Sequence, residues 1–150
     1  MSRTSPSPTD SPAIDLCMSS RIEQVPRLVA QFEDFGLSHG LPASLLHDLQ
    51  VSLDEVLSNI VRYAYADERE HRIGVRVRID PAHVVAEVTD DGRPFNPLEW
   101  PAAGGGPPAR DMDRGLGIYI LRRLLDDLHY ERSGRLNRLV MRKALPARSS

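Results

Sequence analysis

The sequence predicts an α+β two-layer sandwich, in which a mixed, mostly antiparallel sheet is covered on one face by three helices. Some segments alternate apolar and polar residues, as half-buried strands do, and others repeat apolar residues every three or four positions, as amphipathic helices do. The predicted order is strand, helix, helix, hairpin, long loop, helix, hairpin. A chain of 150 residues, 41% of them hydrophobic, has room for one domain, which we assign to residues 13–145.

The amino-terminal part predicts a tail, a strand and a helix. Residues 1–12 are rich in Ser, Pro and Thr and offer nothing to bury, so we expect a disordered tail. Residues 13–18 alternate weakly, which predicts a first strand at an edge of the sheet. Ser20 and Glu23 have the spacing of a capping box, so we expect the first helix to begin there and to end near Gly36.

A second and longer helix is predicted from Pro42 to about Tyr65, because proline suits a helix start. Its apolar residues fall on one stripe when successive positions are placed about 100° apart. A separate polar row without lysine lies about 130° away from that stripe around the axis. The polar row consists of Asp48, Ser52, Glu55, Asn59 and Arg62.

The second half of the chain predicts two hairpins with a loop and a helix between them. Alternating residues predict strands at 72–79 and 83–90, joined by an Asp-Pro turn. Residues 97–114 are rich in Pro and Gly, a composition that excludes a helix or a central strand and is typical of a functional or disordered loop. A third helix is expected at 116–128, and a final hairpin at 129–133 and 138–144 precedes a tail at 146–150.

Composition excludes several classes of function. The formal charge of -2 provides no basic surface for nucleic acid. The apolar runs are too short to span a bilayer, and no amino-terminal signal for export is visible. Cys17 is the single cysteine and has no internal disulfide partner, which favours a reducing cytoplasm. The five histidines lack the spacing of a zinc site.

The sequence contains two candidate sites built on an acidic residue. One pairs the acid with an amide, and the other pairs it with a glycine. Glu55 and Asn59 are one helical turn apart, so their side chains project together and offer oxygen ligands suited to Mg²⁺. The Glu55 carboxylate could also accept a proton from a hydroxyl nucleophile. Asp90 ends a strand, and Gly92 allows close approach of the backbone to a ligand. When each pattern is taken alone, a solvated helix face and an ordinary strand exit are the simpler explanations.

A third candidate lies where the last helix begins. Glycines in the segment RGLG leave backbone N–H groups available for phosphate at a helix amino-terminus, where the helix dipole favours anions. A tight joint between loop and helix is the simpler explanation of this segment. The candidate residues are Arg114, Gly115, Leu116 and Gly117.

Taken in order, these motifs resemble the GHKL ATPase superfamily, which has the Bergerat ATP-binding fold. The resemblance covers residues 14–144. The segment SLDEVLSNIVRYAY resembles the N box, VTDDGRPFNP the first glycine box and RGLGIYILRRL the second. The D-x-G-x-P-F pattern, without a phosphoacceptor helix pair, is most similar to the anti-sigma-factor serine/threonine kinases of bacterial partner-switching systems.

The resemblance implies roles for the candidate residues. Asn59 would ligate the Mg²⁺ that bridges the phosphates of ATP, and Glu55 would be the general base for a serine hydroxyl. Asp90 would accept a hydrogen bond from the adenine amino group, beside Gly92. The 6-oxygen of guanine would face Asp90 as a second acceptor, at a cost of about 1–3 kcal/mol. The second box would bind phosphate through Arg114, Gly115, Leu116 and Gly117, and residues 97–114 would form a lid.

The resemblance also implies partners and leaves alternatives open. A kinase of this type would phosphorylate a small STAS-type antagonist protein and sequester a sigma factor, as a cytoplasmic homodimer that contacts neither nucleic acid nor membrane. The chain departs from the family pattern, because the lid lacks lysine and Asn137 stands where the final hairpin often carries Gly-x-Thr. A nucleotide-gated binding module with little or no kinase activity is therefore a second hypothesis. The catalytic half of a histidine kinase is a third, although no segment has room for its phosphoacceptor domain.

Overall fold

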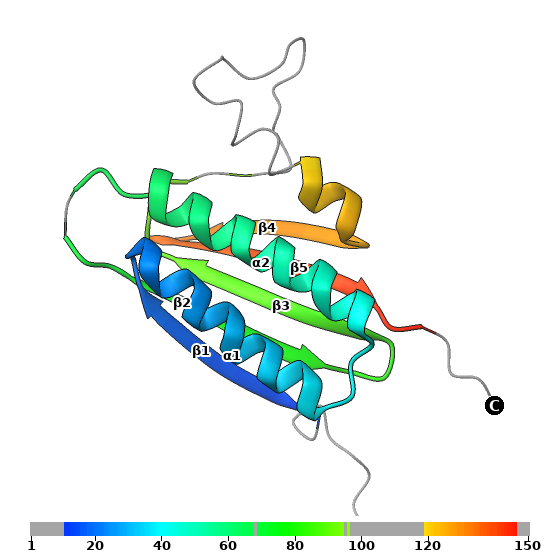
Figure 1. The fold of residues 1–150 in the computed structure, drawn as a ribbon. Helices are drawn as coiled ribbons and strands as arrows, with labels where there is room; N and C mark the ends of the chain where they lie inside the picture. The colour runs from blue at the N-terminus through cyan, green and yellow to red at the C-terminus, as the bar shows by residue number, and fades with distance from the viewer. Residues whose placement is uncertain (1–10, 68, 95, 97–118, 147–150) are drawn as a thin grey trace, which may run out of the picture.

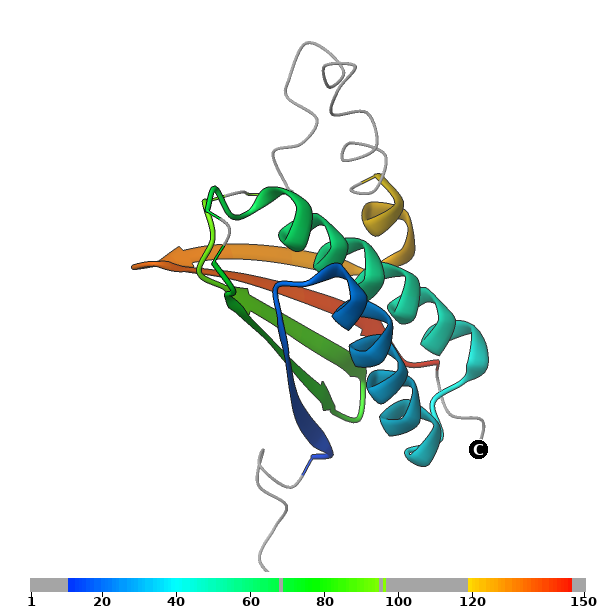
Figure 2. The ribbon, with the colours of Figure 1, turned by 60° about the vertical axis from the view of Figure 1, so that its left-hand side comes forward.

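Five antiparallel strands form one sheet in the computed structural model, which describes residues 11–67, 69–94, 96 and 119–146. The strand order is β1-β2-β3-β5-β4, and the helices lie together on one face of the sheet (Figures 1 and 2). The predicted two-layer α+β sandwich is confirmed, and every strand pair in the described part of the chain is antiparallel. The predicted lid at 97–114 lies outside the described residues, as do residues 1–10 and 147–150.

The first strand and helix occur where the sequence predicts them, with a different junction. Strand β1 (Ala13–Ser19) forms one edge of the sheet, and a short 3-10 helix η2 (Ile22–Gln24) leads into α1 (Val25–Ser38). No side chain caps either helix start, so the predicted capping role of Ser20 is wrong. Its hydroxyl instead accepts a hydrogen bond from the backbone N–H of His71, 2.9 Å away, because the end of β1 lies beside the start of β2.

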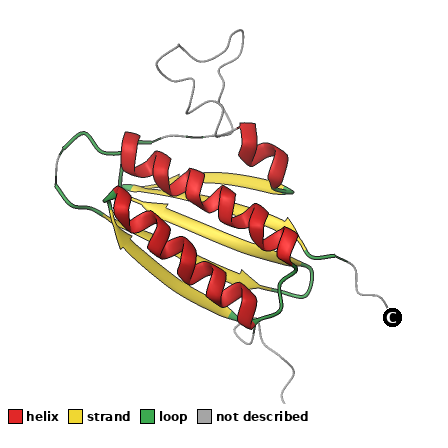
Figure 3. Cartoon of the chain, viewed as in Figure 1, coloured by secondary structure: helices red, strands yellow, loops and turns green. Residues whose placement is uncertain are grey.

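The helix layer buries its apolar stripe against the sheet. Helix α2 (Ala43–Tyr63) runs beside α1 across the sheet (Figure 3). Its leucines enter a core with residues of α1 and with every second residue of the strands, as the spacing predicts. No helix in the described part of the chain is long and apolar enough to cross a membrane. The fully buried members of this core include Leu28, Phe32, Leu49, Leu53, Leu57, Ile73 and Val77.

The two hairpins place the carboxyl end of a central strand beside the last turn of the chain. Strands β2 (Arg72–Ile79) and β3 (His83–Asp90) have the predicted bounds. Strands β4 (Asp127–Ser133) and β5 (Leu136–Ala144) form the second hairpin, and β5 pairs with β3. Helical residues are described at 119–124, and the predicted extension of this helix to Leu128 is wrong, because Leu128 pairs with Met141 of β5.

Candidate functional site

A row of polar side chains crosses three adjacent strands at one end of the sheet. Asp90 ends β3 and lies directly opposite Asn137 of β5, which in turn lies opposite Arg132 of β4. Asp90 and Asn137 share the phase of the buried residues of their strands, so both point toward the helix layer. They are among the few buried polar residues in the described part of the chain, at 5% and 6% exposure.

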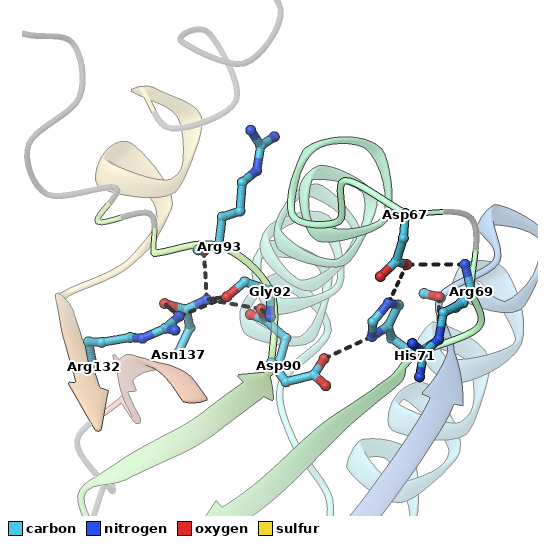
Figure 4. A network of polar contacts seen from close by, with 10 residues as sticks. Asp67, Arg69, His71, Asp90, Gly92, Arg93, Arg132 and Asn137 are labelled. Atoms are coloured by element: carbon cyan, nitrogen blue, oxygen red, sulfur yellow. Dashed lines mark hydrogen bonds and ion pairs between the residues drawn. The ribbon is translucent and has the colours of Figure 1, made fainter. Parts of the chain in front are cut away.

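Within the described part of the chain, only one of the two Asp90 carboxylate oxygens accepts hydrogen bonds. Its Oδ1 accepts a hydrogen bond from the Gly92 N–H at 2.8 Å and another from Asn137 Nδ2 at 3.0 Å (Figure 4). No described residue donates a hydrogen bond to Oδ2. The carboxylate as a whole is buried, so an oxygen with no donor among the described residues suits a ligand that carries an N–H group.

Gly92 lets the backbone turn closely around Asp90 and against the end of α2. A Cβ atom at this position would lie 2.5 Å from Ala64 Cβ and 2.7 Å from Ala64 O. The next residue continues the contact, because the Arg93 N–H donates to Ala64 O at 2.8 Å and its guanidinium donates to Tyr63 O. Glycine is required here by space, and the loop after β3 is fastened to the segment that ends α2.

The Asn137 carboxamide joins this loop to the second hairpin. Its Nδ2 donates to Asp90 Oδ1, to Gly92 O at 3.3 Å and to Arg93 O at 2.9 Å. Its Oδ1 accepts from Tyr130 Oη at 2.5 Å and from Arg132 Nη1 at 3.2 Å. Arg132 Nη1 also donates to Gly92 O at 2.7 Å, so both strands of the second hairpin hold the D-x-G turn.

Opposing influences act on the charge of Asp90. Burial raises the pKa of its carboxyl group, and the negative charge of Asp91 raises it further. The hydrogen bonds from Asn137 and the Gly92 N–H lower this pKa, as does the positive charge of Arg132. Burial dominates, and the pKa of Asp90 is higher than that of an exposed aspartate.

A second cluster lies on the other side of the D-x-G turn, around His71. The His71 ring stacks on Tyr65 at a centroid distance of 4.0 Å, and its nitrogens lie 2.7 Å from Asp67 and 3.3 Å from Asp91. These carboxylates raise the pKa of His71, with the hydrogen bond to Asp67 as the largest cause. Burial raises the pKa of the Tyr65 hydroxyl, and the charges of Asp90 and Asp91 add to this. The cluster brings Tyr65, one of the two tyrosines after the predicted N box, into the surroundings of Asp90.

Glu55 and Asn59 lie in the carboxyl-terminal half of α2, whose end contacts the D-x-G turn. Both side chains are half-buried, whereas Ser52 of the same predicted polar row is fully buried and donates to Asp48 O. Asp48 forms an ion pair with Lys143 of β5 at 3.2 Å. The first residues of the predicted polar row, Asp48 and Ser52, therefore make structural contacts. Glu55 and Asn59, further along the row, are partly accessible to solvent.

A carboxylate and an amide oxygen one turn apart fit a hard cation such as Mg²⁺. Such an ion commonly takes one or two protein ligands and completes its shell with water and substrate phosphate. No group of three or more His, Cys, Asp or Glu side chains in the described ranges could hold a metal ion by itself. The donor set on α2 therefore fits an ion that arrives with a phosphate ligand, and it does not fit a closed protein site.

The structure groups some predicted site residues and shows others that sequence reasoning did not assign. Asp90 and Gly92 form one turn against the end of the helix that carries Glu55 and Asn59. Arg132 and Tyr130 are not among the residues predicted from the sequence, and Asn137 is named there only as a departure from the family pattern. The signal available for Asn137 was its place at the buried phase of an apolar strand. Four predicted residues lie outside the described ranges: Arg114, Gly115, Leu116 and Gly117.

Comparisons with known proteins bear on the family and the fold of the chain. The sequence profile of the histidine kinase-like ATPase domain family matches residues 18–143. The serine-protein kinase RsbW of Bacillus subtilis is 24% identical over 92 residues, 57% of each chain. The serine-protein kinase RsbW of Listeria innocua is 28% identical over 100 residues, which cover 61% of this chain and 63% of that protein. Each match thus spans less than two thirds of the relative.

A solved structure supports the fold independently. The crystal structure of the RsbU and RsbW domains of Rv1364c from Mycobacterium tuberculosis superposes with a TM-score of 0.63. The match covers 92% of this chain and 34% of that chain, at 16% sequence identity. At this identity the likeness is one of fold, and it includes nearly the whole chain.

Proposed function

Because the chain belongs to the histidine kinase-like ATPase domain family, we propose that it binds ATP and phosphorylates a serine of a small protein antagonist. The main observation in support of this proposal is the buried Asp90 carboxylate. One of its oxygens has no donor among the described residues, and it lies beside a turn that only glycine fits. The adenine amino group would donate to that oxygen. Membership of an ATPase family supports ATP as the nucleotide. The similarity to RsbW serine-protein kinases supports a protein serine as the acceptor of the phosphoryl group.

The proposed roles of Glu55 and Asn59 follow from the chemistry of their side chains. The serine Oγ would attack the γ-phosphorus, the bond from that phosphorus to the β–γ bridging oxygen would break, and ADP would leave. Glu55 would take the hydroxyl proton, a contribution of about 10²–10⁴-fold for a positioned base. Asn59 would hold Mg²⁺, which neutralises phosphate charge when bound. Arg114, Gly115, Leu116 and Gly117 remain predicted phosphate contacts, and residues 97–114 a predicted lid.

The cellular role that we propose is that of an anti-sigma factor in a partner switch. The protein would hold a sigma factor in one state and would release a STAS-type antagonist after phosphorylating it. A homodimer and a cytoplasmic location belong to the same proposal. The similarity to RsbW proteins over about 60% of the chain is the support for these partners.

Phosphotransfer from labelled ATP to a cognate antagonist tests the enzymatic part. We expect Glu55→Gln to lower the transfer rate by about 100-fold or more while ATP still binds. Asn59→Ala should weaken both the Mg²⁺ dependence and the rate. Asp54→Asn is the matched control, because Asp54 is an exposed acid of the same helix and accepts a hydrogen bond from the Ser58 hydroxyl. Unchanged transfer in the Glu55 variant would remove its role, and ATP binding without any phosphoserine would favour the nucleotide-gated binding module.

A further inference from the structure

The Asn137 carboxamide has a single orientation that its neighbours impose. Its nitrogen faces three acceptors, namely Asp90 Oδ1 and the carbonyl oxygens of Gly92 and Arg93. Its oxygen faces the Arg132 guanidinium, which has donors and no acceptor. A reversed amide would set oxygen against three acceptors and nitrogen against a cation, so the donor side of Asn137 is held toward Asp90.

Arg132 makes this arrangement rigid from the edge strand. Its Nη1 donates to Gly92 O as well as to Asn137 Oδ1, and its Nε donates to Gly134 O at 3.1 Å. The guanidinium therefore contacts the turn on one side and the amide on the other, without touching Asp90 directly (Figure 4). Its positive charge favours the ionised form of Asp90, and the Asn137 amide adds a donor aimed at the same carboxylate.

The ionisation state of Asp90 determines which purine can pair with it. An ionised carboxylate only accepts hydrogen bonds, so its open oxygen pairs with the 6-amino group of adenine. A protonated carboxyl group carries an O–H donor, which can instead pair with the 6-oxo group of guanine or hypoxanthine. Among the described residues, the charged or titratable groups around Asp90 are Tyr65 beyond α2, Asp91 in its own turn and Arg132 on β4. Of these, only Arg132 favours the ionised form.

We propose that Asn137 and Arg132 are positioning residues that hold Asp90 as an acceptor-only carboxylate and thereby set the preference for a 6-amino over a 6-oxo purine nucleotide. The inference rests on the proposed ATP site. The inference goes beyond the proposed ATP site in two ways. It assigns the base preference to the β4–β5 hairpin, and it makes that preference depend on pH. The preference is greatest where Asp90 is ionised and decreases as the pH falls through its pKa.

The test is binding of ATP and of inosine triphosphate to the full chain, measured by calorimetry between pH 5.5 and 8.5. We expect the wild-type protein to prefer ATP at pH 8 and to lose part of that preference at acidic pH. Arg132→Gln and Asn137→Ala should lower the ATP preference at pH 7 by about fivefold or more, and should move the midpoint of its pH profile upward. Arg135→Gln is the matched control, since Arg135 is an exposed arginine at the tip of the same hairpin.

The pH profile separates a positioning role from a structural one. If Asn137→Ala does not fold, Arg132→Gln replaces an exposed side chain and keeps the experiment decisive. A wild-type preference whose size and midpoint are unchanged in Arg132→Gln would overturn the inference while leaving the ATP site intact. Failure of the wild-type protein to bind either nucleotide would overturn the proposed function, and this inference with it.

Discussion

Two acids of strand β3, three residues apart, have opposite environments. Glu87 lies on the face of the sheet that carries no helices, and both of its oxygens accept hydrogen bonds at 2.9 Å from Arg138. That contact lowers the pKa of Glu87. Asp90 ends the same strand on the helix side, has no cation among the described residues in direct contact, and has a pKa raised by burial. Strand alternation places the two carboxylates on opposite faces and gives them opposite electrostatic responses.

The difference separates an acid that stabilises the fold from one that is available to a ligand. Glu87 has its charge and its hydrogen-bonding capacity satisfied by one bidentate partner. Asp90 is held through one oxygen by neutral donors, and its second oxygen receives no hydrogen bond from the described residues. A buried, incompletely paired carboxylate is costly for a fold alone, and this cost is part of the support for the binding role that we propose for Asp90.

The largest effect is expected from filling the space at Gly92. Gly92→Ala places a methyl group within 2.5 Å of Ala64 Cβ and 2.7 Å of Ala64 O, so the turn must move away from α2. We expect a loss of about 1–3 kcal/mol in the free energy of unfolding and at least about tenfold weaker ATP binding. Thermal denaturation and calorimetry measure the two quantities. Gly74→Ala is the control, because nothing lies within 4 Å of its added Cβ, and equal effects of both variants would contradict this account.

A smaller effect, on stability alone, is expected at Glu87. Its lowered pKa means that the ion pair with Arg138 stabilises the fold above the unfolded-state pKa of about 4.3, and that this contribution is lost as the pH falls through the folded-state pKa. Because both side chains are partly exposed, Glu87→Gln should cost about 0.5–1 kcal/mol at pH 7. Urea denaturation at pH 7 and pH 3 measures this, with little difference expected at pH 3. The ATP affinity of Glu87→Gln should equal that of the wild type. A tenfold loss of ATP affinity would show that Glu87 affects the proposed site around Asp90.

The smallest effect is expected at His71, where a substitution should change how steeply the melting temperature depends on pH. Its raised pKa means that the contacts of protonated His71 with Asp67 and Asp91 stabilise the fold below pH 6.5 or so, and that this is lost as the pH rises through the folded-state value. His71→Phe keeps a ring against Tyr65 and removes the titration. The melting temperature of the wild-type protein should therefore fall more steeply between pH 6 and 8 than that of the variant. Parallel curves would exclude the contribution.

Local patterns in the sequence were sufficient for much of the fold. The strands at 72–79 and 83–90 have the predicted bounds, because their alternation is strong and an Asp-Pro turn separates them. The helical spacing of LRRLLDDL predicts that Leu128 belongs to a helix. In the structure Leu128 lies in β4 and pairs with Met141 of β5. Ser20 fits a helix cap in sequence, yet it bonds to His71, fifty-one residues away.

The site was predictable only where its residues are close in sequence. Asp90 and Gly92 belong to one motif, and so do Glu55 and Asn59, whose proposed roles await experiment. Asn137 reaches Asp90, and Arg132 reaches Asn137, through the register of β3, β5 and β4, which no local pattern contains. The Asn137 hydrogen bond to Asp90 is therefore a result of long-range pairing, whereas the Gly92 N–H contact is local.

Calorimetric titration of ATP into the wild-type protein and Asp90→Asn at pH 7.5 tests the central claim most directly. The variant presents an amide donor to the adenine amino group, so we predict at least about tenfold weaker binding. Because burial raises the pKa of Asp90, its charge opposes folding once the pH exceeds the folded-state value, and the variant should melt no lower than the wild type. Asp91→Asn serves as the control and should retain affinity. Equal affinity of the wild type and Asp90→Asn would contradict the account.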